Sequence, residues 1–252
     1  MAVDLGIDPH DMGSPRCSLA LGGLTRGVSP LEQAAAYAAL AAKGVYARPY
    51  SIARITDRHG HIVYEHESAT SERIDAKETG VLTAALERVV KTGTGRASNI
   101  GRPVAGKTGT TENHADAWFV GYVPQLATAV WVGYLEAQRP MTDVHGIAVV
   151  GGNFPAQIFH DYMQDALANV PVRDLYTASP DALNLRPINA TRQGRATYAS
   201  TTTAPSNGTR AEPTATTTSA PAPTTTSAPA PTTTSAPAPT TTVTVADVAG
   251  GG

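Results

Sequence analysis

The chain has a single cysteine among its 252 residues, Cys17, which excludes an internal disulfide. Cys17 lies beside Leu19 and Leu21 and is most simply a small buried residue. The formal net charge is −2 and no basic run is interleaved with aromatics, so nucleic acid is not an expected partner. No apolar stretch is long enough for a membrane-spanning helix, and the first residues lack the positive charge and apolar core of a signal peptide.

Metal-ligand patterns are also scarce. His59 and His61 share one face of a predicted strand, but no further donor joins them. Polar residues at the tip of a hairpin explain this pair without a metal. No metal and no cofactor are therefore expected.

Bulky apolar side chains are almost absent from the last part of the chain. From about Arg195 onward Thr, Ala, Pro and Ser dominate, and Ser-Ala-Pro-Ala-Pro-Thr-Thr-Thr repeats in tandem from Ser219 to Thr242. Such a composition cannot offset the entropy lost on ordering. We therefore predict a folded domain over residues 1–180 and a disordered low-complexity tail over 181–252, either a wall-contacting spacer or a plain solvated terminus.

Within residues 1–180 the pattern predicts a mixture of helices and antiparallel strands. Ser29-Pro30-Leu31-Glu32 is typical of a helix start, with serine as N-cap and proline in the first turn. Glycine in the turn Asp57–Gly60 indicates a β-hairpin. The expected helices cover 30–43, 75–90 and 154–167, the hairpin strands 50–56 and 61–66, and two further strands 117–123 and 126–134.

The most informative motif, Lys107-Thr108-Gly109-Thr110-Thr111, permits two functions. Gly101 to Thr108 fits the spacing of a phosphate loop, which needs a buried strand before it and a helix beginning at its Lys-Thr. A Gly-rich polar run precedes Gly101, and the segment after Thr108 is poor in helix formers. The apolar segments at 117–123 and 126–134 follow, so Lys107 is predicted in the first strand of a three-strand meander, and a nucleotide is not expected.

A second copy of these letters, Lys91-Thr92-Gly93-Thr94, ends a helical pattern. Glycines after the last helical turn, with Arg88 and Lys91 near its negative end, are typical of helix termination. This copy is interpreted as a helix C-cap.

Taken together, Gly101–Thr111, Asp116-Ala-Trp-Phe-Val-Gly-Tyr122 and Ala129–Tyr134 resemble the C-terminal part of the transpeptidase domain of a class A penicillin-binding protein. Ser18–Gly23, Ser29–Glu32 and Gly93-Thr-Gly95 fit the same family in the same order, so the resemblance covers roughly residues 1–170. It implies an α+β class, a partial penicillin-binding transpeptidase or serine β-lactamase-like fold with an antiparallel sheet packed by helices. It also implies peptidoglycan cross-linking through an acyl-enzyme, and a location at the extracytoplasmic face of the bacterial membrane.

The resemblance assigns roles to the strand motif. Catalytic roles fall to Lys107 and Thr110, and substrate binding to Lys107, Thr108, Gly109, Thr110 and Thr111. Lys107 would supply positive charge for the substrate carboxylate, and the threonine hydroxyls would donate hydrogen bonds to it. Gly109 would allow close backbone approach, and the N–H of Thr110 would be one oxyanion donor. The implied ligands are peptidoglycan stem peptides and β-lactams.

The nucleophile of the family is missing. Its serine lies in Ser-x-x-Lys, but three positions before Lys43, Lys77, Lys91 and Lys107 stand Leu40, Ile74, Arg88 and Val104. No Ser-x-Asn motif occurs either. Without a nucleophile and its base, we expect this chain to be an inactive C-terminal fragment whose partner would be the missing N-terminal half.

Two alternatives stay open. One is a related β-lactamase or carboxypeptidase, but these enzymes need the same nucleophilic serine, which is missing here. The other is a noncatalytic envelope module with a wall-spanning tail. Glu112, His114 and Asp116 are interpreted as a surface turn with Asp116 near the next strand rather than a replacement acid–base set. Cys17 has no placed base that would make it a nucleophile.

Overall fold

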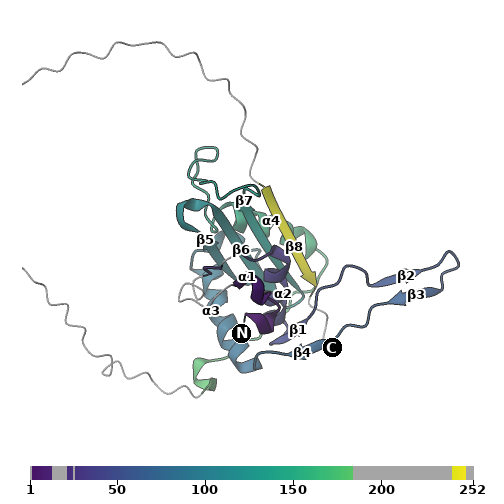
Figure 1. Cartoon of the computed structure of the whole chain (residues 1–252). Helices are drawn as coiled ribbons and strands as arrows, with labels where there is room; N and C mark the ends of the chain where they lie inside the picture. Colours follow the sequence, from purple (N-terminus) through teal and green to yellow (C-terminus); the bar gives the residue numbers. More distant parts are fainter. Residues whose placement is uncertain (1, 13–21, 25, 184–239, 248–252) are drawn as a thin grey trace, which may run out of the picture. The chain divides into compact units, whose positions relative to one another are not determined.

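The protein is described by a computed structural model covering residues 2–12, 22–24, 26–183 and 240–247 (Figure 1). Cys17, most of Ser18–Gly23 and most of the predicted tail lie outside these residues. No helix in the described ranges is both long enough and apolar enough to cross a membrane. The elements in order are η1 Val3–Leu5, α1 Pro9–Met12, α2 Pro30–Ala41, β1 Val45–Ala47, β2 Arg54–Thr56, β3 Ile62–Glu65, β4 Thr70–Glu72, α3 Ala76–Lys91, η3 Arg96–Ser98, β5 Ala105–Thr110, η4 Glu112–His114, β6 Asp116–Val123, β7 Leu126–Gly133, α4 Phe154–Ala166, η5 Pro180–Leu183 and β8 Thr240–Asp247.

The central element is an antiparallel sheet of order β5-β6-β7-β8. Its first three strands form the predicted meander, with β6 and β7 joined at Pro124-Gln125. Both strands are rich in Val and aromatic residues, which suit a pleated, buried surface. β5 lies at one end of this order, so the strand that carries Lys107 is an edge strand.

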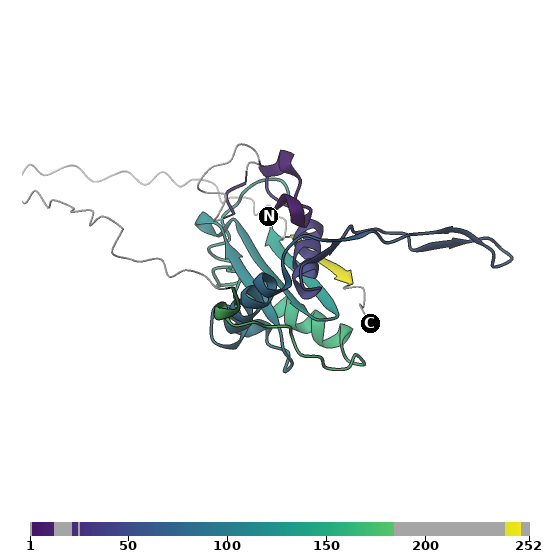
Figure 2. The same ribbon diagram turned by 90° about the horizontal axis from the view of Figure 1, so that it is seen from below.

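Both faces of the sheet are covered by helices, as Figure 2 shows for α2 and α4. Because successive strand residues point to opposite faces, Phe119 packs with Phe159 and Met163 of α4, while Tyr122 packs with Ala36 and other residues of the α2 side. The sheet therefore lies between two apolar layers. The predicted antiparallel sheet packed by helices is confirmed.

The helix ends follow the predicted capping chemistry. The Ser29 hydroxyl accepts a hydrogen bond from the Glu32 N–H, and the Glu32 carboxylate accepts one from the Ser29 N–H, which completes a capping box. The Asp75 carboxylate accepts from the Lys77 N–H at the start of α3. Ala34, Ala35, Ala36 and Ala39 of α2 are buried, which allows the helix to approach the sheet closely.

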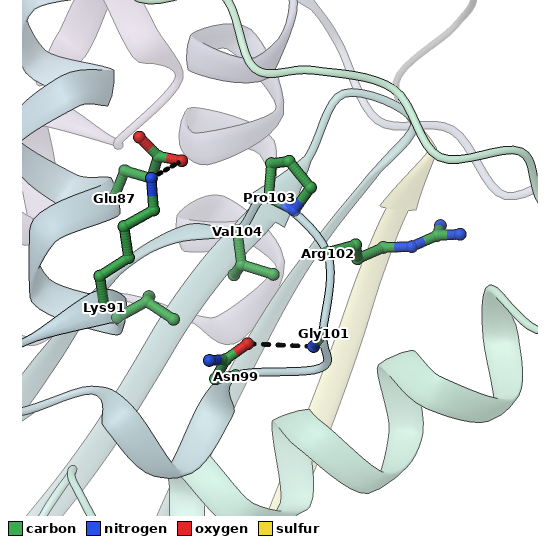
Figure 3. A pocket seen from close by; sticks show the side chains of 8 residues that line it. Glu87, Lys91, Asn99, Gly101, Arg102, Pro103 and Val104 are labelled. Carbon is green, nitrogen blue, oxygen red and sulfur yellow. Dashed lines mark hydrogen bonds and ion pairs between the residues drawn. The ribbon is translucent and has the colours of Figure 1, made fainter.

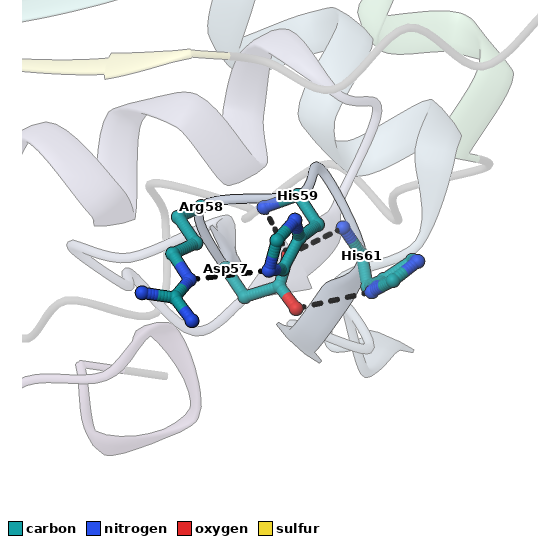
Figure 4. Close-up of polar contacts among 4 residues, drawn as sticks. All are labelled: Asp57, Arg58, His59 and His61. Carbon is teal, nitrogen blue, oxygen red and sulfur yellow. Dashed lines mark hydrogen bonds and ion pairs between the residues drawn. The ribbon is translucent and has the colours of Figure 1, made fainter.

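The predicted hairpin is confirmed as β2–β3, which extends away from the four-stranded sheet (Figure 2). At its tip the Asp57 carboxylate accepts hydrogen bonds from the N–H groups of His59 and His61 and contacts the His61 ring at 3.0 Å (Figure 4). These bonds close the turn that Gly60 completes at φ 86°. They lower the pKa of the Asp57 carboxyl, the His61 N–H being the strongest influence.

Strand β8 corrects the prediction of a disordered tail at its eight residues. Thr240–Asp247 pairs with β7 along its whole length, from Gly133↔Thr240 to Leu126↔Asp247. Each earlier Thr-Thr-Thr segment is followed within a few residues by proline, which cannot donate a hydrogen bond to a neighbouring strand. Thr242 is instead followed by Val-Thr-Val-Ala-Asp, which contains no proline. Threonine and valine favour strands, which suits Thr240–Asp247 to this pairing.

Candidate functional site

The motif Lys107–Thr110 lies in β5, so the predicted strand is confirmed. Lys107 pairs with Val120 and Thr110 with Ala117, both on β6. Lys107 is exposed, and its ammonium donates a hydrogen bond of 2.8 Å to the Thr108 carbonyl. A phosphate loop would need a helix beginning at Lys107-Thr108, and here these residues are in the middle of a strand.

Thr108 and Thr110 share one face of β5, and the hydroxyl of each contacts a group from another segment of the chain. The Thr108 hydroxyl lies 2.7 Å from the Thr94 hydroxyl, and the Thr110 hydroxyl accepts a hydrogen bond of 3.0 Å from the Gly151 N–H. The site therefore combines β5 with the loop after α3 and the loop before α4. Neither Thr94 nor Gly151 was identified as a site residue from the sequence.

The Gly151-Gly152 segment passes very close to β5. A Cβ atom on Gly151 would lie 2.2 Å from the Trp118 carbonyl oxygen and 2.6 Å from that of Gly109. A Cβ atom on Gly152 would lie 2.5 Å from the Thr94 carbonyl oxygen. Only glycine fits at both positions. The Gly-Gly pair before the Pro155 helix start was the one available sequence signal for this contact.

Thr111 and the residues after it form the predicted surface turn. The Thr111 hydroxyl accepts a hydrogen bond of 2.8 Å from the Asp116 N–H, so this hydroxyl is engaged in the turn. Asp116 begins β6, and its carboxylate accepts a hydrogen bond of 2.9 Å from the Trp131 indole. His114 contacts the Val149 carbonyl through its ring. These side chains fix the loops around β5 and do not converge as an acid–base set.

The second Lys-Thr-Gly-Thr copy ends α3 as predicted. Thr92 is the C-cap, with its N–H directed to the carbonyls of Arg88 and Val89. The Lys91 ammonium forms an ion pair of 2.7 Å with Glu87, one turn earlier. The C-cap interpretation is confirmed, although it left out the contact that Thr94 makes with Thr108.

A pocket of about 330 Å³ lies between α3 and the segment that precedes β5 (Figure 3). The Asn99 side chain accepts a hydrogen bond of 3.0 Å from the Gly101 N–H at its rim. None of Lys107–Thr111 lines it, so this pocket is separate from the candidate site. Its lining residues are Glu87, Val90, Lys91, Asn99, Gly101, Arg102, Pro103 and Val104.

Comparison with known proteins gives a consistent result. Residues 6–164 match the family model described as the penicillin binding protein transpeptidase domain. Penicillin-binding protein 1F of Bacillus subtilis is 38% identical over 168 residues, which cover 64% of this chain and 22% of that protein. Penicillin-binding protein 1A of Mycolicibacterium smegmatis is 36% identical over 64% of this chain and 21% of that protein. The chain thus spans about a fifth of the length of these curated relatives.

Solved structures agree with the sequence comparison. The penicillin-binding protein PonA1 from Mycobacterium tuberculosis matches with a TM-score of 0.64 and 30% identity, over 71% of this chain and 50% of that one. The structure of PonA1 in complex with penicillin V matches with a TM-score of 0.63 and 30% identity, over 71% of this chain and 51% of that one. The family-model match over residues 6–164 includes the segment in which the candidate site lies.

Proposed function

Because the chain belongs to the penicillin-binding protein transpeptidase domain family, with class A members as its relatives, we propose that β5 is the substrate-holding strand of a D-alanyl-D-alanine transpeptidase. The reaction is the cross-linking of peptidoglycan through an acyl-enzyme. The observation that carries the proposal is the position of Lys107, Thr108 and Thr110 on a strand at the edge of the sheet.

Each group has a function on this strand. The Lys107 ammonium attracts the terminal carboxylate of a stem peptide, and the hydroxyls of Thr108 and Thr110 donate hydrogen bonds to it. An extended peptide pairs with the open edge of β5 by strand addition. The Thr110 N–H is one oxyanion donor, and the second is the N–H of a serine that no Ser-x-x-Lys motif supplies in this chain.

Binding of an acetylated peptide ending in D-alanyl-D-alanine tests the substrate-holding function. We expect Lys107→Met to weaken binding by about 10- to 100-fold, since hydrogen bonds to charged groups contribute roughly 1.5–3 kcal/mol. Lys77, an exposed lysine on α3, provides the matched control: Lys77→Met should keep the affinity. Equal affinities for Lys107→Met and the unsubstituted chain, measured by titration calorimetry, would exclude this role for β5.

We also propose that this chain forms no acyl-enzyme on its own. A serine activated by a lysine three residues later is absent, and covalent catalysis needs both the nucleophile and its base. Labelling with a fluorescent penicillin is the direct test, with an intact penicillin-binding protein as the positive control. A covalent adduct on this chain would contradict the proposal and reveal another nucleophile.

The missing nucleophile also supports a second function, a noncatalytic module that binds peptidoglycan at the extracytoplasmic face of the membrane. Pull-down with purified peptidoglycan compares the full chain with a variant in which Arg186–Pro237 is replaced by a glycine–serine segment of equal length. The replacement retains Thr240–Asp247. Unchanged binding assigns recognition to the folded part, whereas lost binding assigns it to the tail as a wall-contacting segment.

A further inference from the structure

Two threonine hydroxyls on β5 are held by groups that come from distant parts of the chain. Thr94, 14 residues before Thr108, places its hydroxyl 2.7 Å from the Thr108 hydroxyl. Gly151, 41 residues after Thr110, directs its N–H to the Thr110 hydroxyl at 3.0 Å. The two contacts lie on the same face of the strand, because residues two apart point the same way.

The Gly151 contact restricts how the Thr110 hydroxyl can bond. A hydroxyl has one hydrogen to donate and two lone pairs that accept. The Gly151 N–H only donates, so it occupies a lone pair of Thr110 and repels the hydroxyl hydrogen. That hydrogen is left to point toward another acceptor, and Thr110 is exposed.

The Thr94 contact has two states, because either hydroxyl can be the donor. If Thr108 donates to Thr94, its hydrogen is used. If Thr94 donates to Thr108, the Thr108 hydrogen is free for a ligand. A carboxylate only accepts hydrogen bonds, so a carboxylate ligand selects the second state.

The loop that carries Thr94 is fixed at both sides. The N–H groups of Gly93 and Gly95 donate to the Val89 carbonyl at 3.1 and 3.0 Å. A Cβ atom on Gly95 would lie 3.0 Å from the buried Phe119 ring. Thr94 is itself exposed, so its hydroxyl is not required to fill the core.

The Gly151-Gly152 segment is held against this loop and β5 by close backbone contact. Gly151 Cα faces the backbone of Gly109 and Trp118, and Gly152 faces the Thr94 carbonyl. The Asn153 side chain accepts hydrogen bonds of 2.9 and 2.7 Å from the N–H groups of Val150 and Phe154, which fixes the turn. The Gly151 N–H is therefore a rigid donor.

We propose that Thr94 and Gly151 are positioning residues that set the hydroxyls of Thr108 and Thr110 as paired hydrogen-bond donors. The proposal rests on the substrate-holding function of β5 and adds the groups that orient its two threonine hydroxyls. The site selects a terminal carboxylate over a neutral terminal amide, because two oriented hydroxyl hydrogens need an acceptor that offers no competing donor.

The first test uses the full chain and two peptides that end in D-alanyl-D-alanine, one with a free carboxylate and one with a C-terminal amide. We expect Thr94→Val to weaken binding of the carboxylate peptide about three- to tenfold, the effect of one hydrogen bond, and to leave the amide peptide unchanged. Thr94→Ser keeps the hydroxyl and restores the affinity. Equal weakening for both peptides, or none for either, would overturn the role of Thr94.

A double-substitution comparison separates positioning from a general structural effect. In the Thr108→Val background, Thr94→Val should have no further effect on carboxylate affinity, since its action passes through the Thr108 hydroxyl. Additive losses would mean that Thr94 acts elsewhere. Thr92→Val, two residues away at the helix C-cap, is the matched control and keeps the carboxylate affinity.

A ligand-free measurement tests the geometry independently. By NMR of the full chain, Thr108 should populate one side-chain rotamer in the unsubstituted protein and in Thr94→Ser, and several in Thr94→Val. The Gly151 amide proton should exchange faster in Thr110→Val than in Thr110→Ser. If the chain binds neither peptide, the proposed function is contradicted, and the rotamer and exchange measurements test the positioning role without a ligand. The positioning role is overturned if the Thr108 rotamers are the same in Thr94→Val and in the unsubstituted chain, and the Gly151 exchange rate is the same in Thr110→Val and Thr110→Ser.

Discussion

The hydroxyl groups of Thr83 on α3 and Tyr122 on β6 lie 2.8 Å apart inside the fold. Tyr122 is completely buried and Thr83 is 2% exposed. The Thr83 hydroxyl also donates a hydrogen bond of 2.8 Å to the Thr79 carbonyl, so Tyr122 must be the donor in the pair. This bond fixes α3 to the sheet beside β5.

Removing either hydroxyl should destabilise the fold by different amounts. Thr83→Val leaves the buried Tyr122 donor without its acceptor, and we expect it to lower the free energy of unfolding by about 1–3 kcal/mol. Tyr122→Phe leaves only a lone pair unfilled and should cost about 0.5–1.5 kcal/mol. Urea denaturation measures both. The double variant should lose less than the sum, and strict additivity would argue against a direct bond.

Alkaline pH should weaken the fold through two tyrosines, the half-buried Tyr37 and the fully buried Tyr122. Burial raises the pKa of Tyr37 to about 12, and burial also raises that of Tyr122 against the opposing effect of its Thr83 hydrogen bond. A folded-state pKa above the unfolded value of about 10 gives stability that is complete below pH ~10 and is lost as pH rises toward the folded pKa.

The corresponding measurement is the free energy of unfolding between about pH 9 and 12. It should fall by about 1.4 kcal/mol per pH unit for each of these tyrosines above pH ~10. Tyr37→Phe should remove one part of this slope. The same slope with and without the Tyr37 hydroxyl would contradict the assignment.

Strand β8 should contribute to the stability of the sheet. A chain that ends at Pro239 leaves the β7 edge without its partner strand. We expect its free energy of unfolding to fall by more than about 2 kcal/mol, because several backbone hydrogen bonds are lost and each contributes about 0.5–1.5 kcal/mol. A chain lacking only residues 248–252 is the control.

Addition of a peptide with the sequence of Thr240–Asp247 should restore part of this loss, since strand pairing uses backbone groups and needs no covalent link. The same peptide with proline at the Thr244 position should fail, because it cannot complete the ladder. If truncation at Pro239 leaves the urea midpoint unchanged, β8 is not a stabilising strand.

Local patterns predicted most of the fold. The Ser29 N-cap, the α3 C-cap and the meander around β5 depend on residues within a few positions of one another, and all are confirmed. The pairing of β1 with β4 was not predicted, because two strands of three residues carry no clear alternation. β8 was missed because the composition of the tail outweighed its short Thr/Val run.

The candidate site was predictable only in part, because sequence patterns reveal local structure and not contacts between distant loops. The motif Lys107–Thr110 was identified from its residue types and from the two apolar strands that follow it. Thr94 and Gly151 reach the site because two loops return to β5. The Gly151-Gly152 pair indicates a close backbone approach, but the sequence does not say which strand the loop approaches. The Lys91–Thr94 segment was correctly interpreted as a helix end. That interpretation did not predict that Thr94, its last residue, contacts Thr108.

Alanine substitutions at the two glycines of β5 should affect different properties: Gly106→Ala should lower stability, and Gly109→Ala should weaken ligand binding. A Cβ atom on Gly106 would lie 2.7 Å from the Phe119 ring and 2.9 Å from the Val120 carbonyl oxygen, so Gly106→Ala should destabilise the fold by about 1–3 kcal/mol.

At Gly109 the nearest atom to an added Cβ is the Trp118 Cβ at 3.3 Å, a contact that a small shift relieves. Gly109→Ala should therefore change the free energy of unfolding by less than about 1 kcal/mol. If Gly109 serves close approach of the ligand backbone, the same substitution should weaken binding of the D-alanyl-D-alanine peptide at least about tenfold, since a blocked edge removes several hydrogen bonds. Urea denaturation and calorimetry on the one variant separate the two effects. Full affinity in a stably folded Gly109→Ala chain would show that the ligand does not approach this edge, and a large loss of stability would assign Gly109 to packing.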